Sequence, residues 1–268
     1  MGSLAFDPGF DIRSTGSPLG FCYGPGVFGP EVELRRLDDI RASLRDPGCQ
    51  GPDVVYAISM DTGRDEDRSE LLQHNLLFGA VTYAKGTMGE EPVHSQGHVH
   101  AVSPSCGERT CEVYEIWDGE AFVYLQERVE TDPGVCVAVH AAPGDVVIVP
   151  PGWAHSTVVA DVGQNLTFGA WCVRDYGFDY EGVRAHHGMA WTPVIDHEGG
   201  VRFEANPSYE ADGIAVVEAR AYPEFGIEAE VPVYRQFEGD PGRFDFVADP
   251  RVAAELWHGL EQQLAGLR

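Results

Sequence analysis

Three histidines and one glutamate are spaced so that they could supply four ligands to one metal ion. His98 and His100 are two residues apart, so in a strand both imidazoles project from the same face. Glu112 follows twelve residues after His100, and His155 comes directly after an apolar run and the turn at residues 150–152. Three neutral imidazoles and a carboxylate suit one divalent ion such as Fe(II), Mn(II), Ni(II) or Zn(II). The alternative is that the histidines only pack or form hydrogen bonds, but a chance clustering of such ligands is rare.

These residues belong to two ordered motifs. The first reads His98-x-His100, a spacer, Glu112, six residues and Gly119, and the second reads Gly144, five residues, Pro-x-Gly, two residues and His155. Together they resemble the two motifs of the cupin superfamily, which implies a mainly β fold, the jelly-roll or double-stranded β-helix barrel. The spacer before Glu112 is longer than usual in that superfamily. We therefore expect residues 102–111 to form a hairpin loop at the mouth of the barrel.

Segments outside the motifs are similar to the archaeal cupin-type phosphoglucose isomerases. They are RRLDDI (35–40), DVVYAISM (53–60), SQGHVH (95–100), CEVYEIWDGEAFVYLQ (111–126), PGDVVIVPPGWAHSTVV (143–159) and DYEG (179–182). The resemblance covers about residues 30–210. It implies a homodimeric isomerase of glucose 6-phosphate and fructose 6-phosphate, with His98, His100, Glu112 and His155 as the ligands of a metal that is usually iron.

The same resemblance implies which residues bind the substrate. Tyr56, Tyr114 and Tyr180 would surround the sugar, while Ser95 and the backbone amide of Gly97 would bind the phosphate. A structural role for Tyr114, as an interior aromatic residue with one hydrogen bond, is an equally open interpretation.

The chemistry of the reaction assigns two catalytic residues. Conversion of an aldose to a ketose needs a polarised carbonyl and transfer of a proton or hydride between adjacent carbons. We expect Glu112 to be both metal ligand and general base, and Tyr114, on the same strand face, to hold a substrate hydroxyl. Glu115 should point away from the lumen of the barrel. A hydride shift would need no base, and the sequence leaves that mechanism open.

Two positions that contact phosphate in the family carry no equivalent group in this chain. The threonine position falls on Ala80 or Val81, and the late tyrosine position falls on Cys172. Arg109 or Arg174 could compensate, although each could equally be a solvated surface residue. Two other functions therefore stay open. One is a metal-dependent cupin isomerase, epimerase, decarboxylase or dioxygenase acting on a non-phosphorylated small molecule of specialised metabolism, and the other is a non-catalytic sensor of a sugar or metabolite.

The elements that must hold these residues are predicted to be mostly short strands. Residues 1–29 form an N-terminal arm, residues 30–210 the cupin domain, and residues 211–268 a C-terminal extension packing on the barrel. Within them, apolar spacing predicts a helix over 30–44, a run of barrel strands from Asp53 to Val173, and a hairpin over 191–209. The extension is predicted to contain strands at 215–222 and 231–238, then a helix capped by Asp249 with one apolar face of Val252, Leu256, Leu260 and Leu264.

Composition excludes several classes of partner. Acidic residues outnumber Lys and Arg by 43 to 18, a formal charge of −25, so the average surface repels nucleic acid and anionic membranes. No run of 18 apolar residues could span a membrane, and the N-terminus has no pattern of an export signal. The six scattered cysteines are expected to be reduced thiols, with a disulfide between Cys106 and Cys111 disfavoured. These features predict a cytoplasmic enzyme of a small-molecule substrate.

Overall fold

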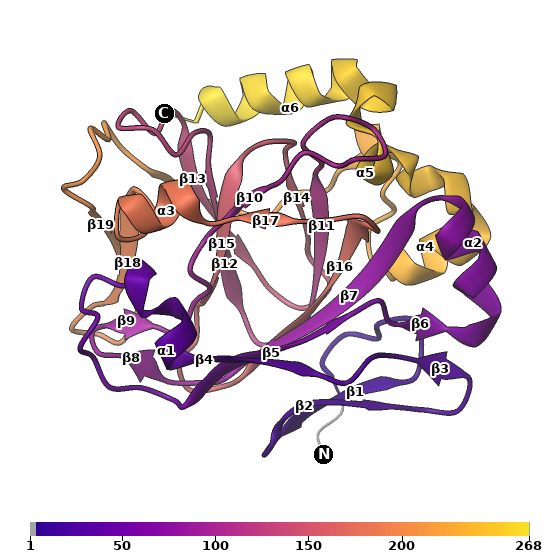
Figure 1. Cartoon of the computed structure of the whole chain (residues 1–268), viewed down its shortest axis with the longest axis horizontal. Coiled ribbons are helices and arrows are strands. Elements are labelled where there is room, and N and C mark those ends of the chain that lie inside the picture. Colours follow the sequence, from indigo (N-terminus) through magenta and orange to yellow (C-terminus); the bar gives the residue numbers. More distant parts are fainter. Residues whose placement is uncertain (1–3, 268) are drawn as a thin grey trace.

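Two sheets face each other in the computed structural model, which describes residues 4–267 (Figure 1). The six-stranded sheet has the order β14 (Val146–Val149), β11 (Glu112–Asp118), β16 (Leu166–Val173), β7 (Leu76–Tyr83), β5 (Val54–Met60) and β4 (Glu33–Arg36). The four-stranded sheet has the order β15 (Ala154–Val159), β12 (Ala121–Gln126), β13 (Cys136–Ala141) and β20 (Ala215–Glu218). All neighbours are antiparallel except β13 and β20. The prediction of a mainly β cupin barrel is confirmed.

Strand β11 shows how the sequence divides its side chains between two environments. Glu112 and Tyr114 point into the space between the sheets, whereas Glu115 and Trp117 point to the outer face of the six-stranded sheet. All four side chains are buried, so the outer face is also covered. The strand therefore links a polar interior site to an external packing layer.

The outer face of the six-stranded sheet is covered by aromatic rings from the C-terminal extension. The ring of Trp171 on β16 lies 5.7 Å from Tyr234, 4.8 Å from Phe237 and 5.2 Å from Phe244, measured between ring centroids. Tyr234 and Phe237 belong to α4 (Val233–Gly239), which is followed by α5 (Asp245–Ala248) and α6 (Ala254–Ala265), all yellow in Figure 1. The division of the chain at residues 29 and 210 stays a prediction, but the extension contacts its own barrel over this face.

Glu115 is a buried carboxyl group within this outer layer. It points away from the lumen, as expected, and accepts hydrogen bonds from Trp117 Nε1 at 2.8 Å and from the backbone N–H of Val233 at 2.7 Å. Burial raises the pKa of Glu115 to about 8, although both hydrogen bonds oppose the shift. This residue joins the start of α4 to the middle of β11.

The prediction of one helix over residues 30–44 is wrong in its first half. Glu33–Arg36 forms the edge strand β4, in which Arg35 pairs with Tyr56 of β5. Only α1 (Leu37–Ile40) and a 3-10 turn at Arg41–Ser43 are helical. The edge of β5 offers backbone hydrogen bonds to this segment, and these tertiary partners override a weak local spacing. Leu34 is consequently 40% exposed instead of buried on a helix.

Two predictions in the extension also need correction. Residues 231–238 are mainly the helix α4, because Tyr234 and Phe237, three residues apart, both reach Trp171; a short apolar run does not distinguish a helix from a strand. Asp249 does accept a capping hydrogen bond from Arg251 N, but it caps a 3-10 turn at Pro250–Ala253 that precedes α6. This tighter turn leaves Val252 66% exposed.

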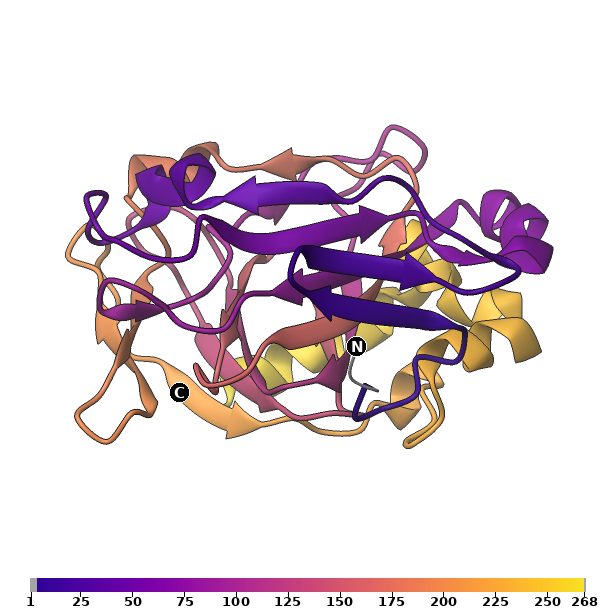
Figure 2. The same cartoon turned by 90° about the horizontal axis from the view of Figure 1, so that it is seen from below.

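The remaining elements surround the two sheets. The N-terminal hairpin of β1 (Ile12–Gly16) and β2 (Leu19–Tyr23) packs against β5 and β7, as Figure 2 shows. The predicted hairpin is confirmed as β18 (Trp191–Ile195) and β19 (Val201–Ala205). Shorter elements are β3 (Val27–Phe28), β6 (Gly63–Arg64), α2 (Arg68–Gln73), β8 (Thr87–Met88), β9 (Glu91–Pro92), β10 (Val99–His100), β17 (Phe178–Asp179) and α3 (Glu181–Ala185). Among the described residues, no helix is both long enough and apolar enough to cross a membrane.

Candidate metal centre and active-site pocket

The four predicted ligands converge between the two sheets. One ligand atom from each of His98, His100, Glu112 and His155 lies within 4.8 Å of the other three. Glu112 comes from β11 of the six-stranded sheet and His155 from β15 of the four-stranded sheet, while His100 lies on β10. Residues brought together from three separate elements in this way form a compact donor set at the centre of the barrel.

The backbone fixes two of these ligands directly. His98 and His155 form an antiparallel bridge, in which His98 N donates to His155 O at 3.1 Å and His155 N donates to His98 O at 2.9 Å. Only Val99 and His100 form a regular strand in the segment predicted as one, so this bridge, more than strand periodicity, holds the His98 side chain beside His155. Their ring centroids are 4.2 Å apart.

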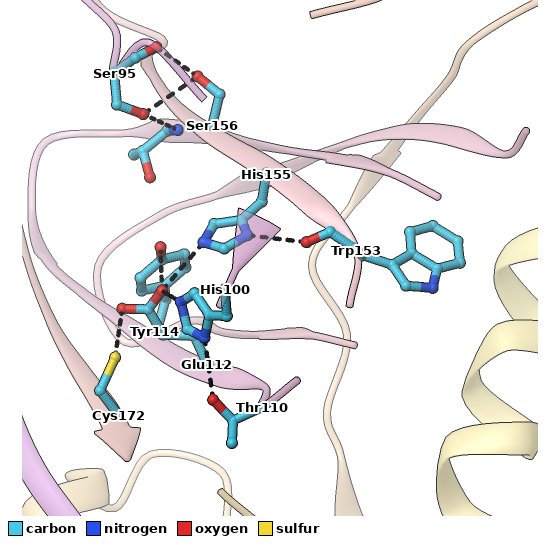
Figure 3. Close-up of polar contacts among 10 residues, drawn as sticks. Ser95, His100, Thr110, Glu112, Tyr114, Trp153, His155, Ser156 and Cys172 are labelled. Carbon is cyan, nitrogen blue, oxygen red and sulfur yellow. Dashed lines mark hydrogen bonds and ion pairs between the residues drawn. The ribbon is translucent and has the colours of Figure 1, made fainter. Parts of the chain in front are cut away.

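The hydrogen bonds of the imidazoles suit a cation at the centre of the cluster. When His155 donates its Nδ1 proton to the carbonyl oxygen of Trp153, 3.4 Å away, its Nε2 presents a lone pair to Glu112 Oε2 at 3.1 Å (Figure 3). Burial lowers the pKa of His155, which keeps the ring neutral. A lone pair facing a carboxylate is unfavourable unless a cation lies between them.

His98 and His100 complete this arrangement. His98 Nε2 is buried without a hydrogen-bond partner among the described residues, and burial lowers the pKa of His98 well below its usual value. His100 Nδ1 faces Thr110 Oγ1 at 3.3 Å, which leaves His100 Nε2 directed at Glu112 Oε2 at 3.2 Å (Figure 3). An unpartnered buried nitrogen costs roughly 1–3 kcal/mol, and a metal ion would remove that cost. The residues therefore fit a divalent ion held by three imidazoles and one carboxylate.

Glu112 is ionised in this environment. Burial alone would raise its pKa, but when the Nε2 atoms of His100 and His155 carry protons, their hydrogen bonds and charges outweigh burial and hold the pKa of Glu112 well below the usual value. Tyr114 Oη donates to Glu112 Oε2 at 2.8 Å, and Cys172 Sγ donates to Oε1 at 3.1 Å (Figure 3). Both oxygens of the carboxylate are thus held by donors, one from the same strand β11 and one from the neighbouring strand β16.

A pocket opens beside this cluster. Four of the five residues predicted to contact substrate line it, namely Tyr56, Ser95, Tyr114 and Tyr180, together with His98 and Glu112. Gly97 lies next to the pocket and not in its wall: it is buried with φ +82°, and Met189 and Val183 pack over it. Ser95 Oγ already accepts a hydrogen bond from Thr157 N at 3.1 Å.

Several residues around the site were missed by sequence reasoning. Tyr83 stacks on Tyr56 with ring centroids 4.8 Å apart, and Phe178 lies 4.4 Å from the ring of His98. Thr110 comes from the inserted loop, whose hairpin form was expected and is seen in the bridge between Val102 and Arg109. Only the alternation along β7, which gives Val81 and Tyr83 the same face, could have suggested Tyr83.

The two arginines considered as replacements for the missing phosphate contacts are engaged elsewhere. Arg174 makes two hydrogen bonds of 2.8 Å to the carboxylate of Asp61 and also donates to Leu76 O. Arg109 donates to the backbone oxygen of His100 and lies 3.7 Å from Asp179. Both contribute to structure around the site and neither lines the pocket.

Comparisons with known proteins agree with this geometry. The family model described as glucose-6-phosphate isomerase matches residues 35–210. The glucose-6-phosphate isomerase of Pyrococcus furiosus is 33% identical over 194 residues, which are 69% of this chain and 91% of that protein. The enzyme of the same name from Thermococcus gammatolerans is 30% identical over 184 residues, 66% of this chain and 86% of that protein. A third, from Pyrococcus horikoshii, is 32% identical over 193 residues, 69% of this chain and 91% of that protein.

These matches cover both cupin motifs and every residue of the candidate metal cluster. The chain belongs to the glucose-6-phosphate isomerase family.

Proposed function

We propose that this chain is a metal-dependent isomerase that interconverts glucose 6-phosphate and fructose 6-phosphate. The observation that carries the proposal is the cluster of His98, His100, Glu112 and His155 beside a pocket walled by tyrosines, in a chain of this family. A cation site and an ionised carboxylate facing one cavity are the two groups that aldose–ketose conversion by proton transfer requires.

The four clustered side chains would hold one divalent ion, with Fe(II) proposed first and Mn(II), Ni(II) or Zn(II) as the other ions suited to this donor set. When bound, the ion supplies Lewis-acid polarisation of the substrate carbonyl. Thr110 and the carbonyl of Trp153 hold the protons of His100 and His155 on Nδ1, so that both Nε2 atoms remain available to it.

Glu112 is proposed to move the proton. Its carboxylate removes a proton from C1 of fructose 6-phosphate while the C2 carbonyl oxygen gains a proton, which gives the enediol. The carboxylate then returns its proton to C2 as the C1 hydroxyl loses its proton, which yields the aldose. The low pKa of Glu112 keeps the carboxylate ionised at neutral pH, so that it acts as a weak general base. Tyr114, whose hydroxyl donates to Glu112 Oε2, orients the carboxylate and lies within reach of a substrate hydroxyl. Tyr56 and Tyr180 are proposed to enclose the sugar and exclude water, and Ser95 and the Gly97 amide to contact its phosphate end.

A second candidate function is favoured by one specific observation. The positions where the family contacts phosphate carry Ala80 or Val81, of which Val81 adds an apolar surface to the pocket, and Cys172, whose thiol donates a hydrogen bond to Glu112. A pocket without those donors suits a non-phosphorylated small molecule, on which a metal-dependent cupin could act as an isomerase, epimerase, decarboxylase or dioxygenase.

Proton NMR in D₂O tests these alternatives. Fructose 6-phosphate and fructose are incubated in parallel with iron- or manganese-loaded protein, and His155→Ala serves as the control. Formation of glucose 6-phosphate by the wild type alone supports the proposal, and deuterium at C2 supports proton transfer over a hydride shift. If the loaded wild type leaves both sugars unchanged, the isomerase proposal is wrong.

Assembly and location are also proposals. The homodimer and the cytoplasmic location follow from the resemblance to the archaeal isomerases and from the composition. Light scattering after size-exclusion chromatography tests the first, since a homodimer would have about twice the chain mass of 29.2 kDa.

A further inference from the structure

One arginine near the pocket differs from all others in the described part of the chain. Every other arginine between residues 4 and 267 lies within 4.0 Å of a carboxylate oxygen, whereas Arg184 has no such partner. In a protein with a formal charge of −25, acidic partners are abundant. Because Arg184 has no carboxylate beside it, its positive charge is available to bind another anion.

The contacts of Arg184 direct it toward the pocket wall. Its Nε donates to Gln96 Oε1 at 3.0 Å, and its guanidinium carbon lies 4.9 Å from the ring centroid of Tyr180. Both Gln96 and Tyr180 line the pocket. Gln96 stands between Ser95 and Gly97, so Arg184 lies beside the segment already proposed to contact phosphate. The two terminal nitrogens of the guanidinium are not used by these contacts and can donate two hydrogen bonds to one anion.

A second guanidinium lies on the β4 side of the same tyrosine. Arg35 pairs in register with Tyr56, and its Nε is buried without a hydrogen-bond partner among residues 4–267. Burial raises the pKa of the Tyr180 phenol; the positive charges of Arg35 and Arg184 oppose that shift, and the carboxylates of Glu33 and Glu112 add to it. Both guanidiniums therefore lie close enough to Tyr180 to act on its hydroxyl.

Among residues 4–267, no arginine or lysine lines the pocket itself. Arg109 and Arg174 are held by other partners, as described above, so the arginines at the Tyr180 edge remain as candidates to bind a phosphate dianion. Such a dianion needs compensation, because burying an uncompensated charge is strongly unfavourable.

We propose that Arg184, supported by Arg35, binds the phosphate group of the substrate at the Tyr180 edge of the pocket. This inference rests on the proposed function and deepens it, since it names the residues that select a phosphorylated sugar over a free one. The two guanidiniums take the place of the donors that Val81 and Cys172 do not supply. Arg184 would thus determine specificity without taking part in proton transfer.

Steady-state kinetics of Arg184→Gln test the inference. The KM for fructose 6-phosphate is expected to rise about 10- to 100-fold with kcat changed less than about 3-fold, because one charge-assisted contact made equally in ground and transition states is lost. The inhibition constant of inorganic phosphate, used as a competitive inhibitor, is expected to rise in parallel. Arg184→Lys should recover part of the loss, since it keeps the charge but not the planar geometry.

Two further variants serve as controls. Arg202→Gln removes the same charge from the β18–β19 hairpin, where Arg202 pairs with Glu204, and is expected to leave KM unchanged. Glu33→Gln frees Arg35 from its carboxylate partner, now 2.7 Å away, and is expected to lower KM.

An unchanged KM in Arg184→Gln, or an equal rise in Arg202→Gln, would overturn the inference while leaving the isomerase proposal intact. If the wild type turns over no sugar phosphate, the proposed function fails separately. Calorimetric titration with inorganic phosphate then tests the anion site alone: tighter binding by the wild type than by Arg184→Gln supports it, and equal or absent binding by both refutes it.

Discussion

Substitution of Glu115 by glutamine isolates the effect of one buried carboxyl group on stability. Glu115 has no exposed surface and accepts hydrogen bonds from Trp117 and from the first residue of α4. The amide of glutamine has nearly the same shape but does not titrate. The variant therefore removes the ionisation of this group and leaves the other titrating groups in place.

The magnitude follows from the difference between the folded and unfolded pKa values. The folded pKa of about 8 lies above the ordinary value of 4.5, so the folded state binds this proton more tightly than the unfolded state does. Stability from this group is fully present below the unfolded pKa and is lost as pH rises toward the folded pKa. Between pH 6 and pH 9 the wild type is expected to lose about 3 kcal/mol of unfolding free energy relative to Glu115→Gln.

Urea unfolding of both proteins at pH 6, 7.5 and 9 measures this difference. Tryptophan fluorescence is a suitable signal, because Trp117 and Trp171 both lie in the layer that Glu115 anchors. Subtracting the unfolding free energy of one protein from that of the other at each pH cancels the contributions of the remaining titrating groups. A difference that stays constant within about 0.5 kcal/mol across this range would show that Glu115 is ionised in the folded protein, contrary to the reasoning above.

Three other predictions concern the candidate site. His98→Ala removes the nitrogen that has no partner among the described residues. The metal content measured by mass spectrometry is expected to fall from about one ion per chain to background, and full occupancy would contradict the ligand assignment. Thr110→Val removes the acceptor facing His100 Nδ1 and is expected to weaken metal affinity about 10-fold in a chelator competition, with Thr110→Ser as the control. Gly97→Ala places a Cβ 2.6 Å from Met189 Sδ at φ +82° and is expected to cost about 1–3 kcal/mol in urea unfolding. Gly213→Ala, which meets open space, should cost much less.

The metal cluster could be predicted from the sequence because the spacing and order of its four ligands match two recognisable motifs. The backbone bridge that brings His98 beside His155 does not follow from strand periodicity and is seen only in the structure. Thr110, Tyr83 and Arg184 were not predictable in the same way. Tyr83 and Arg184 acquire their roles from contacts with Tyr56 and Gln96, which lie on other elements. Thr110 lies only ten residues from His100, but the fold of the inserted loop decides that contact.

The errors in the fold have a related cause. Residues 33–36 and 233–239 have apolar spacings that fit either a helix or a strand over so short a length. The free edge of β5 selects a strand for the first segment, and the ring of Trp171 selects a helix for the second. In both cases the partner surface decided between two conformations that local preference leaves nearly equal.

The reciprocal backbone bridge between His98 and His155 has a consequence for how an ion is captured. Two hydrogen bonds of 3.1 and 2.9 Å fix the main chain of both residues, and both side chains are packed among other rings of the site. Few side-chain torsion angles of His98 and His155 remain to be ordered when an ion binds, so most of the conformational entropy that coordination requires is lost when the chain folds. Exchange of one ion for another would then require local side-chain motion only, and the ion that occupies the centre would reflect cellular supply as much as the preference of the site.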